Sequence, residues 1–60
     1  MKYSKSDYYY YEGDYQATVD WIEMGAEWTI ETAHSIDSRC AYNRGYKNRV
    51  ERLKVNNNEN

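Results

Sequence analysis

The stretch that decides the fold is residues 14–36, which read DYQATVDWIEMGAEWTIETAHSI. Apolar side chains recur through it at steps of three or four residues, and the spacing continues slightly beyond it. That period is the one of an amphipathic α-helix, and the chain contains no proline to interrupt it. The spacing therefore predicts a helix from Asp14 to about His34 or beyond. The residues that carry the period are Tyr15, Val19, Ile22, Ala26, Ile30, Ala33, Ile36 and Cys40.

Several residues mark where helices begin and end. Gly13 allows the chain to turn, and Asp14 after it is a good N-cap. Residues 34–38 form the weakest helical stretch, where Ser35 or Asp37 can cap a new helix. We therefore expect an all-α fold over 14–55, either a small helical hairpin or one long kinked helix. A second set of apolar positions continues the spacing downstream, at Tyr42, Tyr46, Val50 and Leu53, with Gly45 as a soft point.

Residues 18–32 have a competing interpretation as a β-hairpin that turns around Gly25. Positions 28–32 alternate between apolar and polar residues and are rich in types that favour strands. However, Trp21 and Ile22 are adjacent and break the alternation of the first strand. The longer helical period therefore favours the helix.

The two ends of the chain follow neither period. Four consecutive tyrosines, Tyr8 to Tyr11, would cover most of the circumference of a helix or both faces of a strand. We therefore expect residues 1–13 to form an extended, flexible arm. Residues 56–60 are polar and are expected to form a disordered tail.

The composition limits how the protein stabilises itself and where it is located. Its 60 residues make at most one domain, with no Phe and eight Tyr, and Cys40 is its single cysteine. This excludes an internal disulfide and a Cys/His zinc site, so we expect a partner or a homo-oligomer to complete the core. No signal peptide or stretch of about 20 apolar residues is present, which predicts a soluble, cytoplasmic protein without a membrane partner.

Charge divides the chain into two parts. Residues 1–38 carry two basic and eight acidic side chains, a net charge of −6, and residues 39–60 carry a net charge of +4. Either the two parts face each other, within one chain or in a dimer, or each forms a separate surface for a partner.

Two tryptophans are candidate anchors for a protein partner. Trp21 and Trp28 are seven residues apart, so on one continuous helix they share a face, with Gly25 between them. In the simplest interpretation the two rings cover a small core. In the functional one they enter a groove on a partner, because Trp and Tyr are enriched at binding hot spots.

The arm is the second candidate surface, because it mixes aromatic rings with carboxylates. It is either a leader with no role or a recognition arm that folds onto a basic protein surface, and in a variant of the second interpretation the arm mimics nucleic acid. Its candidate binding residues are Tyr8, Tyr9, Tyr10, Tyr11, Glu12 and Asp14.

Nucleic-acid binding is the alternative function, placed on the basic part of the chain. Basic residues interleaved with Tyr42 and Tyr46 can hold phosphates and stack on bases, although basic C-terminal helices are also common as solvated faces. The candidate residues are Arg44, Lys47, Arg49 and Arg52.

The sequence predicts no enzyme, cofactor or metal site. His34 is the single histidine, and its neighbours Ser35 and Asp37 are too close in sequence to form a catalytic triad with it. The profile of a tiny Tyr- and Trp-rich chain resembles that of many phage-encoded accessory proteins. The resemblance implies an inhibitor that blocks or mimics a ligand site on a larger protein.

Overall fold

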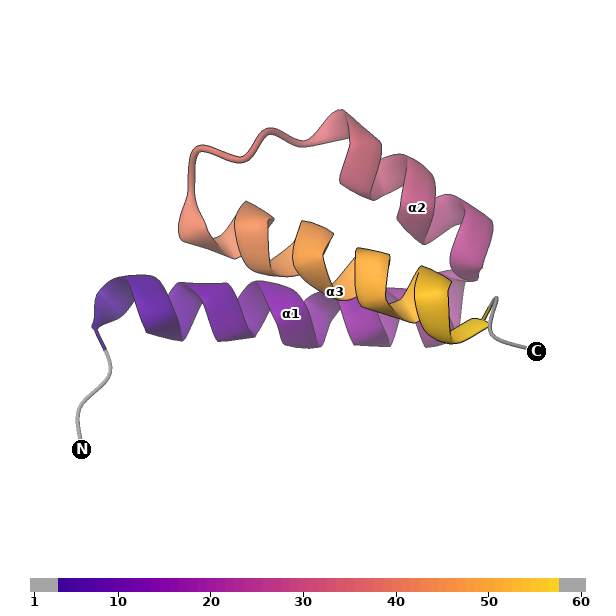
Figure 1. The fold of residues 1–60 in the computed structure, drawn as a ribbon, viewed down its shortest axis with the longest axis horizontal. Helices are drawn as coiled ribbons and strands as arrows, with labels where there is room; N and C mark the ends of the chain where they lie inside the picture. The colour runs from indigo at the N-terminus through magenta and orange to yellow at the C-terminus, as the bar shows by residue number, and fades with distance from the viewer. Residues whose placement is uncertain (1–3, 58–60) are drawn as a thin grey trace.

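The computed structural model describes residues 4–57, which form three α-helices and no strand. These are α1 (Lys5–Met24), α2 (Ala26–Ser35) and α3 (Ala41–Asn57). Figure 1 shows that α1 and α3 lie side by side and run in the same general direction. Helix α2, which lies between them in the sequence, runs in the opposite direction and packs beside α3. The predicted all-α class is confirmed, and the β-hairpin over 18–32 is wrong.

Helix α1 begins nine residues earlier than the sequence predicted. Ser4 is its N-cap, because the Ser4 hydroxyl accepts a hydrogen bond of 3.1 Å from the amide of Asp7. The interpretation of 1–13 as an extended arm is therefore wrong for residues 5–13, while 1–3 lie outside the described residues. Asp14 is not an N-cap, since it lies in the middle of the helix.

Gly25 ends the first helix and starts the second. Its φ of 99° is in the region that favours glycine, and its carbonyl accepts bonds from the Thr29 amide at 3.2 Å and the Thr29 hydroxyl at 2.9 Å. The predicted single helix from Asp14 to His34 is therefore broken here. The turn lies where the rejected hairpin placed it, but it joins two helices.

Two glycines bring α1 and α3 into backbone contact. A Cβ on Gly13 would overlap the carbonyl of Tyr42, and a Cβ on Gly45 would overlap the carbonyl of Tyr10. Both glycines are buried inside helices, so their role is to permit close approach rather than to form turns. This crossing also explains why the tyrosine run is helical, because the packed face of α1 continues back to Tyr10.

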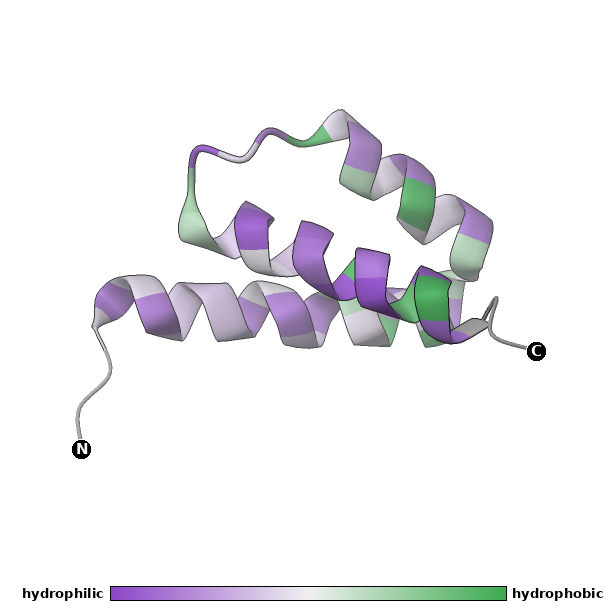
Figure 2. Ribbon diagram, in the orientation of Figure 1, coloured by the Kyte–Doolittle hydropathy of each residue, from purple (hydrophilic) through white to green (hydrophobic). Residues whose placement is uncertain are grey.

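The core is small and is built largely from small or amphipathic side chains. Figure 2 shows few strongly hydrophobic residues in the first half of α1, where the tyrosines lie. Half-buried Trp21, Ile30, Ile36 and Tyr42 surround the core. Its buried members are Ala17, Ala33, Tyr46 and Val50, together with the hydroxyl-bearing Thr29.

The predicted apolar period identified only part of this core. Tyr46 and Val50 are buried as the spacing predicted, and so is Ala33. On α1, however, Tyr15 and Ile22 point to solvent, because the buried side of this helix is the side with Gly13 and Ala17.

The loop 36–40 and the end of α3 complete the chain. Asp37 accepts a hydrogen bond of 2.9 Å from the Arg39 amide, which makes a turn rather than a helix cap. Helix α3 extends through Asn57, so the expectation of a disordered tail is wrong for residues 56–57. Residues 58–60 lie outside the described residues.

Candidate functional site

Helix α1 carries a second apolar face opposite the one that packs on α3. At 3.6 residues per turn, positions two apart differ by about 200° around a helix, so Tyr11 lies opposite Gly13 and Tyr15 lies opposite Ala17. We call this second face the outer face of α1. Its members, with their exposed fractions, are Tyr8 (56%), Tyr11 (58%), Tyr15 (69%) and Ile22 (76%).

A shallow groove of about 540 Å³ lies along this face, where the side of α1 meets α3. The Tyr8 hydroxyl donates a hydrogen bond of 2.9 Å to Glu12 inside it. Tyr42 is the one member that α3 supplies. The groove is lined by Tyr8, Tyr11, Glu12, Tyr15, Gln16 and Tyr42.

The electrostatic character of the groove is acidic and aromatic. The hydrogen bond to Glu12 raises the pKa of Tyr8, and the Glu12 charge adds to this effect. Desolvation raises the pKa of Tyr42, with further contributions from the charges of Asp20 and Glu12. Neither Lys nor Arg lines the groove. The groove therefore favours the neutral forms of Tyr8 and Tyr42 and offers one carboxylate, that of Glu12.

The two predicted tryptophan anchors are not brought together as expected. The break at Gly25 places Trp21 on α1 and Trp28 on α2, so the shared helical face is wrong. Trp21 is half-buried and packs against the core, as the simpler interpretation had it, while Trp28 is 44% exposed. Gly25 with Trp28 lines a separate shallow depression at the α1–α2 corner.

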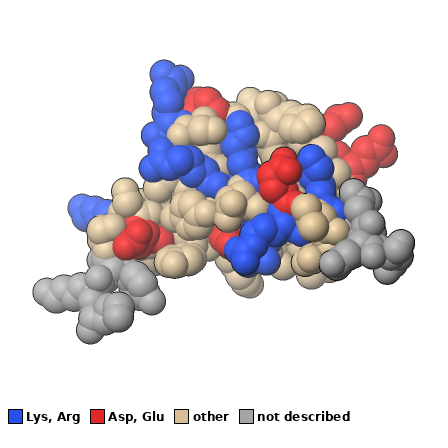
Figure 3. Space-filling model, in the orientation of Figure 1, with Lys and Arg blue, Asp and Glu red and all other residues tan. Residues whose placement is uncertain are grey.

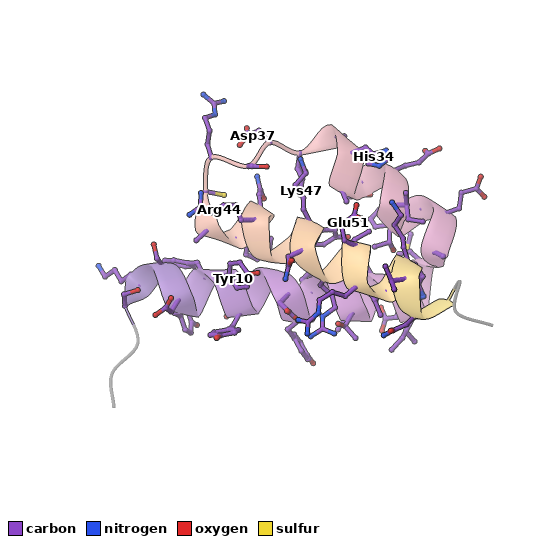
Figure 4. The ribbon with its side chains drawn as sticks, in the orientation of Figure 1. Tyr10, His34, Asp37, Arg44, Lys47 and Glu51 are labelled. Atoms are coloured by element: carbon purple, nitrogen blue, oxygen red, sulfur yellow. The ribbon has the colours of Figure 1, made fainter. Side chains whose placement is uncertain are left out.

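The predicted binding residues of the arm divide between the two sides of α1. Tyr8, Tyr11 and Glu12 belong to the outer face or its groove. Tyr9 is exposed beside Tyr8, with the two ring centroids 5.3 Å apart. Tyr10, labelled in Figure 4, is half-buried at the crossing with α3.

Asp14, a predicted binding residue of the arm, holds the two charged parts of the chain together. Arg49 of α3 donates to both of its carboxylate oxygens, at 2.8 and 3.3 Å. The Asp14 side chain is only 15% exposed and that of Arg49 31%, so this is a partly buried, two-bond ion pair. Asp20 adds a second link, since the Tyr46 hydroxyl donates to it at 2.6 Å. The acidic and basic parts therefore face each other within one chain.

The basic candidates on α3 are mostly occupied by contacts within the chain. Figure 3 shows Lys and Arg side chains spread over α3 on the viewed face. Arg44 donates to the carbonyls of Ser38 and Arg39, at 2.9 and 3.2 Å. Lys47 reaches the carbonyl of Ile36 at 2.7 Å, and Figure 4 shows it extending toward the loop. With Arg49 paired, Arg52 is the member of the set that remains exposed to solvent without such a contact.

Sequence reasoning missed four members of this site: Tyr15, Gln16, Ile22 and Tyr42. Tyr15 and Ile22 were assigned to the core because they fit the helical period. The signal that could have separated them is the second, parallel period of small residues at Gly13 and Ala17. Two small residues four apart on a helix allow another backbone to approach and so identify the packed face.

Within residues 4–57, no group of three or more His, Cys, Asp or Glu side chains is placed to hold a metal ion. None of the helices in that part of the chain is long and apolar enough to cross a membrane. His34 is exposed near the end of α2. No protein-family model, curated protein or solved structure matches this chain.

Proposed function

We propose that this chain is a small protein-binding module, and that the outer face of α1 docks on a larger protein. The observation that carries the proposal is the exposure of Tyr8, Tyr11, Tyr15 and Ile22 directly opposite the packed face of the same helix. The chain has few apolar residues, and four large aromatic or aliphatic side chains on the solvent side of α1 are not available to the core.

The dimensions and residue types of this face support binding. From Tyr8 to Ile22 the helix rises about 21 Å, at 1.5 Å per residue, which is enough to lie along a groove on a partner. Tyrosine supplies a large contact area with little loss of side-chain entropy. Contiguous apolar patches on small monomers often mark interaction sites.

The charges beside the outer face indicate a basic partner. The exposed charged side chains of α1 are the carboxylates of Asp7, Glu12 and Glu23 against the one ammonium group of Lys5, so the exposed surface of this helix is acidic. A twofold dimer through the outer face would place Glu12 and its neighbours against the same residues of the second copy, and like charges oppose each other there. A complementary basic surface avoids this repulsion and speeds association.

Inhibition follows from such docking. A basic surface that accepts this helix is one that also attracts acidic ligands, so an occupied surface excludes them. Nucleic acid as the ligand of this chain has less support, because Lys47 and Arg49 are held in contacts within the fold.

Site-specific photo-crosslinking tests the proposal. We replace Tyr15 with p-benzoylphenylalanine, irradiate the protein in an extract of the cells that produce it, and identify covalent adducts by mass spectrometry. A matched variant carries the same group in place of Arg39, whose side chain is 89% exposed in the loop before α3. We expect a single adduct from position 15, with a protein that presents a basic surface, and none from position 39.

Two outcomes contradict the proposal. The same adducts from both positions would mean that the crosslinker reports exposure rather than docking. An adduct between two copies of this chain would replace the partner with self-association.

A further inference from the structure

The groove on the outer face combines aromatic rings with a carboxylate. Of the six described residues that line it, four are tyrosines, a fifth is Glu12, and none is basic. Aromatic rings carry negative charge density on their faces and attract cations that lie over them. A cluster of tyrosines around a carboxylate is therefore suited to one kind of group, a positively charged side chain.

Glu12 has capacity for such a group. It accepts one hydrogen bond from Tyr8, whereas an ionised carboxylate offers about four acceptor sites. The bond from Tyr8 also fixes the carboxylate relative to the ring of Tyr8, since the two residues are one helical turn apart. An incoming donor therefore meets an acceptor that is already positioned.

None of the Lys and Arg side chains among residues 4–57 lines the groove. Arg49 is held by Asp14, Arg44 by the loop carbonyls and Lys47 by Ile36. Lys5 is exposed in the first turn of α1 and forms no ion pair with the described residues. No described cation pairs with Glu12, so a cation of another molecule can bind it.

We propose that the groove binds an arginine side chain of the protein partner, with the guanidinium stacked on tyrosine rings and hydrogen-bonded to Glu12. This inference rests on the proposed function and names the group that α1 recognises. Arginine fits better than lysine for two reasons. Its planar guanidinium stacks on aromatic rings and forms two parallel hydrogen bonds with a carboxylate. It is also more weakly hydrated than an ammonium group, so it loses less hydration when it binds in a shallow groove.

Nuclear magnetic resonance titration of the ¹⁵N-labelled full chain tests this directly. The probes are N-acetyl-arginine methylamide, its lysine counterpart and the uncharged counterpart built on citrulline. We expect saturable shift changes with the arginine probe in the millimolar range, confined to the six lining residues. The citrulline probe should bind at least about tenfold more weakly, and the lysine probe several-fold more weakly.

Matched carboxylate variants show whether Glu12 is the acceptor. Glu12→Gln should lower the affinity for the arginine probe about tenfold and remove most of the dependence of that affinity on salt. Glu23→Gln makes the same charge change on the exposed surface of α1 outside the groove, and it should leave the affinity unchanged. A ¹⁵N spectrum with unchanged dispersion confirms that each variant is folded.

Three results overturn the inference: equal binding of arginine and citrulline probes, shifts centred on Glu27 and Glu31 instead of the groove, or no saturable shift. These results do not decide the proposed function, which the crosslink from position 15 tests separately. Conversely, arginine binding in the groove without a partner adduct would leave the groove chemistry intact and remove the docking role.

Discussion

Gly13 and Gly45 stand where one methyl group on either would overlap the backbone of the opposite helix. In an ordinary helix, replacing glycine with alanine stabilises the fold by up to about 1 kcal/mol. At this crossing the clash with a carbonyl group outweighs that gain, because the backbone cannot move aside as a flexible side chain does.

We predict that Gly13→Ala destabilises the protein by about 2 kcal/mol. In a domain of this size the corresponding fall in melting temperature is about 10 °C. Thermal denaturation followed by far-ultraviolet circular dichroism measures it. An unchanged or higher melting temperature would show that the two helices do not cross at this residue.

Tyr46 gives the fold a dependence on alkaline pH. Its ring is buried, and its hydroxyl donates to Asp20 at 2.6 Å. Desolvation, followed by the hydrogen bond to and the charge of Asp20, raises the pKa of Tyr46 well above its ordinary value of 10.0. A raised pKa means that the stabilisation is complete below pH 10 or so and is lost as the pH rises further, because the unfolded chain then releases the proton first.

We therefore predict that the free energy of unfolding falls as the pH rises above about 10, and that Tyr46→Phe reduces this fall. At neutral pH the same substitution should cost about 1.5–3 kcal/mol, the usual value of a hydrogen bond to a charged group. Urea denaturation at a series of pH values measures both. Tyr9→Phe, which changes an exposed ring, is the matched control. Parallel pH profiles for wild type and Tyr46→Phe would contradict the assignment.

Helix α2 is the least secured element of the fold. It has only 10 residues, and a helix shorter than about 12 residues is marginal without tertiary packing. Two of its residues, Thr29 and Ala33, are buried. The loop that follows it is held by α3, through Lys47 at the Ile36 carbonyl and Arg44 at the Ser38 carbonyl.

We predict that the amides of α2 exchange through openings of lower free energy than those of the α1–α3 pair. Lys47→Met keeps an unbranched side chain that is one atom shorter but removes the donor, so it should speed exchange in α2 and leave α1 unchanged. Native-state hydrogen exchange resolves the three helices separately. Uniform protection across all of them would mean that the fold opens as one unit.

At the level of elements, the sequence predicted the helical class and the core role of Tyr46 and Val50. It did not reveal the start of α1 or the break at Gly25. The N-cap at Ser4 has the form of a Ser followed three residues later by an acid, but the tyrosine run after it has no amphipathic period. A single glycine in a helical pattern costs only about 1 kcal/mol, so the pattern alone does not show that Gly25 ends the helix.

The packed face of α1 was missed for a physical reason that also concealed the site. Hydrophobic periodicity weighs side chains by size and polarity, so it assigned Tyr15 and Ile22 to the core. The close crossing instead uses Gly13 and Ala17, which contribute little hydrophobicity but allow backbone contact. The outer face was thus visible in the sequence only as an excess of aromatic residues.

For the whole molecule, the distribution of charge predicts weak binding to nucleic acid. Of the basic residues of α3, Arg49 pairs with Asp14 of α1, while Arg44 and Lys47 bind carbonyls of the loop 36–40. We predict no retardation of RNA or DNA at moderate salt in a gel-shift experiment. Binding that falls steeply with salt, and that weakens further in Arg52→Ala, would contradict this prediction and revive the basic helix as the functional surface.

One face of α1 packs on α3, and we propose that the opposite face binds a partner. Isothermal titration of the crosslinked partner with wild type and with Tyr15→Ala/Ile22→Ala tests this proposal. Two hot-spot truncations of about 2 kcal/mol each sum to about 4 kcal/mol, so we predict a dissociation constant about a thousandfold larger for the double variant. Its free energy of unfolding should stay close to that of wild type, because both side chains are exposed. A dissociation constant within a few-fold of wild type, in a variant that is equally stable, would show that the outer face of α1 does not bind the partner.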